Sequence, residues 1–106
     1  MTDTGDKPVR FHPYPPLDVP LGQVLVTKDA VEALALGGTS LDDVLAQHAE
    51  GYGGDFDYEE RFENYDTAAA GGDNSSLYTV AEGVTLLVHT PWHRQTTVVS
   101  LYTEAE

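Results

Sequence analysis

The chain has 106 residues, carries 18 acidic side chains against five basic ones, and contains no cysteine. Its formal net charge of −13 disfavours direct binding to nucleic acid, and the missing cysteines exclude disulfides and thiolate metal sites. The length predicts one domain, and the absence of a long apolar run or a basic leader predicts a cytoplasmic protein without membrane contact.

Residues 1–20 are predicted to form an extended, proline-rich arm. Five of the six prolines lie in this segment, and proline fits neither a helix interior nor a central strand. Phe11, Tyr14 and Leu17 are interleaved with these prolines. The arm packs its apolar side chains on its own domain, acts as a polyproline-type ligand, or exchanges between the subunits of a homodimer.

Residues 21–106 are predicted to form a single α+β domain that begins with a strand and a helix. A β-rich run at residues 23–27 predicts the strand. Thr27 or Asp29 can cap the helix that follows, and Gly37-Gly38 ends it. The buried side of this helix is predicted to consist of Val31, Leu34 and Ala35.

Two more helices are predicted in the middle of the chain. Ser40 begins the second helix, with Asp43 at the capping-box position, and Asp57 begins the third. Glycines follow both helices, at Gly51 and at Gly71-Gly72. The second helix carries a one-face apolar stripe, Leu41, Val44, Leu45 and His48, and the third carries an aromatic stripe, Tyr58, Phe62, Tyr65 and Ala69.

The last third of the chain predicts three strands, at residues 76–80, 84–89 and 96–103. A short connection, Ala81-Glu82-Gly83, predicts a hairpin between the first two. The strand near residues 84–88 is apolar on both sides, which predicts a central position in the sheet. The resulting order β-α-α-α-β-β-β predicts an antiparallel meander with the helices on one face.

The acidic residues concentrate between residues 50 and 66, where seven acids are offset only by Arg61. A calcium loop beginning at Asp55 would need glycine where Glu60 stands, so no metal is expected there. The segment is either a solvated helix face or an acidic surface that attracts a basic partner, with aromatic side chains as anchors. The candidate partner-binding residues are Tyr52, Asp55, Phe56, Asp57, Tyr58, Glu59, Glu60, Glu63 and Asp66.

A polar loop ahead of the last strand, containing Trp92, His93 and Arg94, is the second candidate site. Histidine can act as a general acid or base and arginine can stabilise an anion, so a small metal-independent ribonuclease using His93, Arg94 and Thr96 is one alternative. The shortage of basic residues opposes it, and the sequence shows no Ser/His/Asp pattern or phosphate-binding loop.

The four histidines show no metal-ligand spacing, so neither a metal nor a cofactor is expected. His48 closes the apolar stripe of the second helix, which is typical of a hydrogen-bonded histidine in or near the core.

Several short motifs resemble a family of small proteins carried by plasmids, integrative elements and phages. They are Leu21-Gly22, Gly54-Asp55, Glu63-Asn64, Ser76-x-Tyr78, Thr90, and Arg94-x-Thr96-Thr97-Val98-Val99, across residues 21–102. Pro91-Trp92-His93 stands where that family carries an acidic Glu-Ala-Asp. The resemblance implies a role in mobile-element biology and supplies no enzymatic activity.

Together these observations predict a small acidic, non-enzymatic binding protein. Its expected partner is a basic protein surface, such as that of a nucleic-acid-binding protein, and its expected role is inhibition of a defence system of the CRISPR or restriction type. A structural or oligomeric accessory protein, dimerised through the N-terminal arm, is the third possibility.

Overall fold

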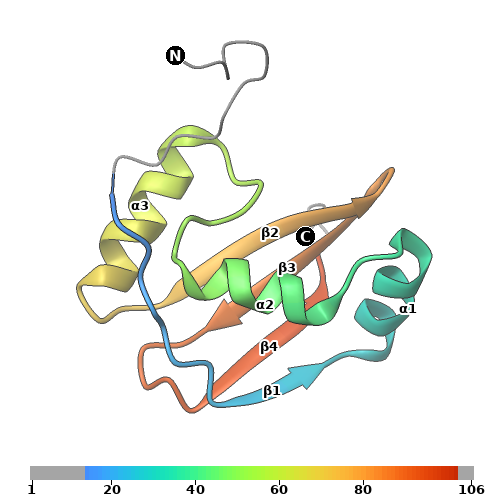
Figure 1. The fold of residues 1–106 in the computed structure, drawn as a ribbon, viewed down its shortest axis with the longest axis horizontal. Helices are drawn as coiled ribbons and strands as arrows, with labels where there is room; N and C mark the ends of the chain where they lie inside the picture. The colour runs from blue at the N-terminus through green and yellow to red at the C-terminus, as the bar shows by residue number, and fades with distance from the viewer. Residues whose placement is uncertain (1–13, 103–106) are drawn as a thin grey trace, which may run out of the picture.

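The computed structural model describes residues 14–102, which form three helices and four strands in the predicted α+β order. The elements are β1 (Gln23–Val26), α1 (Lys28–Gly37), α2 (Leu41–Ala49), α3 (Tyr58–Ala69), β2 (Asn74–Ala81), β3 (Val84–Thr90) and β4 (Thr96–Leu101). Helices α1 and α2 lie over one face of the sheet, and α3 lies near the start of β2 (Figure 1). No helix within residues 14–102 is long and apolar enough to cross a membrane.

The sheet is mixed, so the predicted antiparallel meander is wrong for its first strand. The order is β1-β4-β3-β2, in which β2, β3 and β4 form the predicted meander while β1 pairs parallel to β4. The helical crossover carries the chain from β1 to the opposite edge of the sheet at β2, and two hairpin connections then return it to β1. β3 lies in the interior of the sheet, as its apolar sequence predicts.

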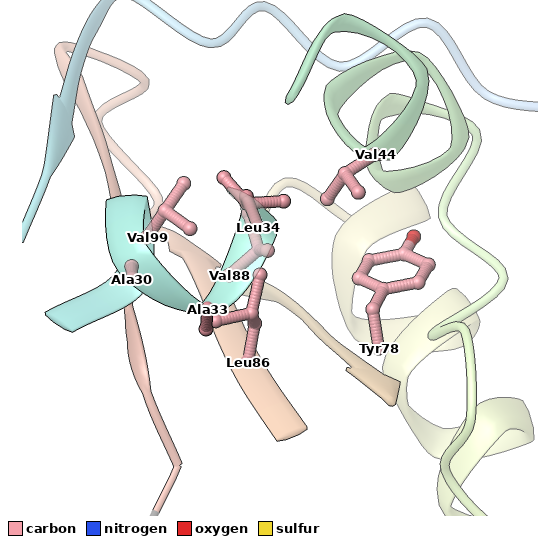
Figure 2. Close-up of a cluster of buried hydrophobic side chains, with 8 residues drawn as sticks. All are labelled: Ala30, Ala33, Leu34, Val44, Tyr78, Leu86, Val88 and Val99. Carbon is pink, nitrogen blue, oxygen red and sulfur yellow. The ribbon is translucent and has the colours of Figure 1, made fainter. Parts of the chain in front are cut away.

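The core lies between the sheet and the first two helices (Figure 2). It consists of Ala30, Ala33, Leu34, Val44, Tyr78, Leu86, Val88 and Val99. The predicted face of α1 is therefore only partly right, because Leu34 is buried while Val31 is 53% exposed. Small residues face the sheet instead, since α1 approaches it closely: a Cβ on Gly37 would lie 2.1 Å from the Val80 carbonyl oxygen.

The helices begin where the sequence predicts, because their caps are local. Thr27 accepts a hydrogen bond from the Ala30 amide, which selects Thr27 over Asp29 as the cap of α1. Ser40 and Asp57 cap α2 and α3 in the same way. The predicted stripe of α2 is confirmed, with Val44 and His48 buried.

The outer edge of β2 is sealed by the segment that precedes α3. The Asp55 amide donates to the Leu77 carbonyl at 2.7 Å, and the Leu77 amide donates to the Gly53 carbonyl at 3.1 Å. The Thr79 amide donates to Asp55 Oδ2 at 2.7 Å. Gly54 allows this close approach, since it has a φ of +63° and a Cβ there would lie 2.2 Å from the Leu77 carbonyl oxygen.

The described part of the N-terminal segment packs on its own domain. The amides of Leu17 and Val19 donate to the carbonyls of Glu50 and Ala49, at the end of α2. The Tyr14 ring stacks on Tyr65 of α3 with a centroid distance of 5.1 Å. Phe11 and the rest of residues 1–13 lie outside the described residues, so exchange of the arm between subunits stays a prediction.

Candidate functional site

Helix α3 carries the predicted acidic surface. Glu59, Glu60, Glu63 and Asp66 are all exposed, whereas Arg61 on the same helix is only partly exposed. Glu59 and Glu60 lie in the first turn, where the helix dipole favours negative charge. Within residues 14–102 the one close contact between a basic and an acidic side chain is between His89 Nε2 and Asp73 Oδ2, at 3.7 Å, so these four carboxylates have no basic partner there.

Two of the predicted partner-binding acids have structural roles. Asp57 is the N-cap of α3, where its Oδ1 accepts from the Glu60 amide at 2.9 Å. Asp55 accepts from the Thr79 amide and so closes the edge of β2. The charges of both residues are still exposed and add to the field around α3.

The three predicted aromatic anchors differ in accessibility. Tyr52 is partly buried, stacks on Tyr65 at 5.9 Å, and donates from its hydroxyl to the Tyr14 carbonyl. Phe56 is also partly buried. Tyr58 is 63% exposed and contacts Phe62 edge to face, whereas Tyr65, further along the same aromatic stripe of α3, is buried. The exposed Tyr58 ring remains available as an anchor.

A hollow between α3 and the start of β2 brings part of the predicted set together. It has a volume of about 290 Å³ and is open to solvent. Its lining consists of Phe56, Glu60, Glu63, Asn64, Thr67, Asp73 and Ser75, and we call it the acidic hollow. Three carboxylates and one aromatic ring line it, with no basic side chain among them.

The acidic hollow borders a Ser75–His89–Asp73 cluster that the sequence analysis missed. Ser75 Oγ lies 2.8 Å from His89 Nδ1, and His89 Nε2 lies 3.7 Å from Asp73 Oδ2. Ser75 and His89 are cross-strand partners of β2 and β3, so the expectation of no Ser/His/Asp pattern is corrected by strand register. Counted back from the hairpin at residues 81–83, Ser75 would pair with Thr90, and the register shift between Thr79 and Ala81 brings it opposite His89 instead.

The polar groups beside Ser75 limit what that cluster can do chemically. The Ser75 amide donates to Asn64 Oδ1 at 2.7 Å. The Asn64 side-chain amide donates in turn to the Gly51 carbonyl and to Asn74 Oδ1. Neither group is therefore available as an oxyanion donor, which is the contribution that acyl transfer most needs.

The loop between β3 and β4 holds the second predicted site, and its arginine is committed to the fold. Arg94 Nη1 donates to the Gly72 carbonyl at 2.7 Å, and Nη2 donates to the Ala68 carbonyl at 3.2 Å, so the guanidinium caps the end of α3. Arg94 also has a φ of +60°, the only positive φ among the non-glycine residues described. These contacts weigh against the ribonuclease alternative.

The remaining residues of this loop are turned toward solvent or held locally. Trp92 is 66% exposed, and its amide donates to Asp73 Oδ1 at 2.9 Å. His93 is exposed, with its Nδ1 accepting from the Gln95 amide at 3.1 Å. Thr96 is partly buried at the start of β4. The loop thus presents an aromatic surface beside the end of α3.

His48 is buried, as expected for a histidine that closes an apolar stripe. Its Nδ1 lies 2.7 Å from Ser76 Oγ and its Nε2 lies 2.9 Å from Thr90 Oγ1. Thr97 donates its only hydroxyl proton to the Leu21 carbonyl, so in its contact with Thr90 it must accept. Thr90 therefore donates to Thr97, and it accepts in turn from the Nε2–H of His48. Burial, followed by the positive charges of His89 and Arg94, lowers the pKa of His48 to about 4.

In the part of the chain that the structure describes, no three histidine or acidic side chains gather closely enough to hold a metal ion. No protein-family model, curated protein sequence or solved structure matches the chain. The resemblance to mobile-element proteins therefore stays a prediction, and the function has to be argued from the site.

Proposed function

We propose that this protein is an acidic binding module that docks a basic protein surface through α3. The observation that carries the proposal is the acidic hollow beside the exposed carboxylates of α3, with no basic side chain lining it. Unpaired surface carboxylates of one sign raise the local concentration of basic partners and speed their association.

The acidic hollow supports a specific kind of contact within that interface. Glu60, Glu63 and Asp73 line it together with the Phe56 ring. A lysine or arginine side chain of the partner can place its charge near these carboxylates while its aliphatic stem lies against the ring. Tyr58, on the neighbouring turn of α3, supplies an exposed aromatic contact of the type that dominates interface energies.

The narrower form of the proposal is an inhibitor of a CRISPR or restriction defence system in the cytoplasm, acting on a nucleic-acid-binding protein. It rests on the sequence resemblance and on the small, acidic character of the chain. A basic groove built for phosphates is the surface that an acidic face complements.

The test removes charge from the acidic hollow without changing side-chain shape. The α3 pair is the double variant Glu60→Gln and Glu63→Gln. The control pair is the double variant Glu32→Gln and Asp42→Asn, which removes the same amount of charge from exposed positions on α1 and α2. Titration calorimetry with an arginine decamer at low salt measures binding. We expect at least about tenfold weaker binding for the α3 pair and little change for the control pair.

Equal weakening by both pairs would show that only net charge matters and would overturn α3 as the site. The same three proteins, used as baits for the heparin-binding fraction of a bacterial lysate, then test the narrower form. We expect proteins retained by the wild type to be lost with the α3 pair and kept with the control pair. Retention by all three baits would contradict it.

A further inference from the structure

The four strands contain no aspartate, glutamate, lysine or arginine, although the chain has 23 of these among its 106 residues. An uncharged inner face is expected, because it packs against α1 and α2. The second face, which we call the outer face, has no helix over it within residues 14–102 (Figure 1). When one face of a sheet lies in water, the side chains that point to that face are normally polar or charged. The lack of aspartate, glutamate, lysine and arginine on the outer face therefore needs an explanation.

The register of the strands identifies the outer face. Thr97 and Val99 of β4 are buried, so Val98 between them points to the opposite side. Val98 pairs with Leu25 of β1 on one side and with His89 of β3 on the other. The outer face consists of Gln23, Leu25, Ser75, Leu77, Thr79, Thr85, Leu87, His89, Thr96, Val98 and Ser100.

Apolar side chains cluster on this face rather than lying singly. Leu25 is 45% exposed and Val98, its cross-strand neighbour, is 36% exposed. Leu77 and Leu87 are also cross-strand partners, and both are partly exposed. Serine and threonine side chains, with Gln23 and His89, fill the positions between them, so the face is partly apolar and has no acidic side chain of its own.

We infer that the outer face binds the outer face of a second copy of this chain. Each copy carries a net charge of −13, so most approaches between two copies are repulsive. The acids of the described residues lie on helices and loops, and none lies on a strand. Face-to-face contact places the two neutral sheets together and leaves α1 and α2 of each copy pointing outward.

Self-association also fits the chemistry of the face better than a basic partner does. A neutral surface offers no electrostatic attraction to a basic protein, whereas a two-fold interface requires a patch that is complementary to itself. Leucine, valine and hydroxyl side chains satisfy that requirement. The inference rests on a different surface from the proposed function, because α3 lies at the edge of β2 and only Ser75 belongs both to the outer face and to the lining of the acidic hollow.

The size of the outer face sets the strength of the contact. Strands about 4.8 Å apart and about six residues long give a face of about 400 Å², or about 800 Å² for both copies. Stable interfaces bury about 1,200–2,000 Å² in total, so the dimer should be weak, with dissociation in the range of about 10 µM to 1 mM.

Sedimentation equilibrium of the full chain tests the inference with a matched pair of variants. Val98→Lys places a charge on the outer face, and Val31→Lys places the same charge on the exposed side of α1. We expect the mass of the wild type and of Val31→Lys to rise from 11.5 kDa toward twice that value with concentration. Val98→Lys should remain monomeric, although its lower net charge weakens the general repulsion.

Two results would overturn the inference. One is a wild type that stays monomeric up to about 1 mM in about 0.5 M NaCl, where the repulsion is screened. The other is association that is equally strong in Val98→Lys and Val31→Lys, which would place the contact elsewhere, for example at the N-terminal arm. If circular dichroism shows that Val98→Lys is unfolded, Leu25→Lys on the same face replaces it with the same expected outcomes.

Discussion

His48 joins α2 to two strands of the sheet through both of its ring nitrogens. Ser76 lies on β2 and Thr90 on β3, and the chain of hydroxyls continues to Thr97 on β4. The pKa of His48 is lowered to about 4 because the buried site favours the neutral ring. An unfolded histidine titrates near pH 6.5, so between these values the unfolded state binds more protons than the folded state.

We therefore expect the free energy of unfolding to fall as the pH is lowered from about 6.5 to about 4, by roughly 3 kcal/mol from this residue. The contribution is fully present above that window and is lost as the pH falls through it. Urea unfolding near pH 7, 5.5 and 4.5 measures it. His48→Gln should show a weaker pH dependence, whereas His93→Gln, at an exposed position, should match the wild type. Equal pH dependence in wild type and His48→Gln would contradict the assignment.

The end of helix α3 depends on a side chain from a different element. The Arg94 guanidinium donates to the carbonyls of Ala68 and Gly72. The Ala68 carbonyl also accepts from the Gly71 amide at 3.1 Å, so Arg94 adds to the local cap at this end. Arg94→Asn keeps a residue type that tolerates a positive φ and removes these hydrogen bonds. We expect unfolding free energy to fall by about 1–3 kcal/mol, measured by urea unfolding at neutral pH. A variant as stable as the wild type would show that water replaces the guanidinium at no cost.

One of the three hydrogen bonds that seal the edge of β2 uses a carboxylate oxygen. Asp55 Oδ2 accepts from the Thr79 amide, which would otherwise be an unpaired edge donor. Asp55→Ala should lower the unfolding free energy by about 1 kcal/mol and speed hydrogen exchange of the Thr79 amide. Asp55→Asn keeps an acceptor oxygen and should leave that exchange slow. Fast exchange in both variants would mean that the charge, rather than the hydrogen bond, protects the edge.

Features of the elements that depend on neighbouring residues could be predicted from the sequence. Thr27, Ser40 and Asp57 cap helices because their side chains reach amides three residues away, and that spacing is visible in the chain. Glycines mark the helix ends for an equally local reason, seen in the positive φ of Gly38. The predicted helices accordingly match the observed ones closely.

Features that depend on contacts between distant residues could not be predicted in the same way. The parallel pairing of β1 with β4 joins residues about 70 positions apart, and no local pattern encodes its direction. The close approach of α1 to the sheet decides which side of that helix is buried, so Val31 is exposed despite its apolar side chain. For the candidate site, the acidic residues of α3 were visible in the sequence, whereas the hollow and the Ser75–His89 pair arise from strand register.

At the scale of the whole molecule, charge is segregated by element. The described residues include 14 acids against three lysines and arginines, all of them on helices and loops, while the strands hold none of either kind. Among residues 14–102 the one close contact between a basic and an acidic side chain is that of His89 with Asp73, so little of the negative charge is compensated within the fold. Repulsion between the helices' carboxylates therefore opposes the compact state.

Salt should for this reason stabilise the protein. The Debye length falls from about 30 Å at 0.01 M salt to below about 10 Å above 0.1 M, which removes repulsion between carboxylates on different helices. We expect Tm to rise by several degrees between about 0.01 M and about 0.5 M NaCl. The rise should be smaller for the double variant Glu32→Gln and Asp42→Asn, because it has less negative charge for salt to screen. Differential scanning calorimetry at neutral pH measures both, and KCl should give the same curve because screening depends on ionic strength rather than on the ion. A Tm that is flat or falls with salt would mean that the acidic helices already lie far enough apart for water to screen them, and the charge would then act only on partners outside the molecule.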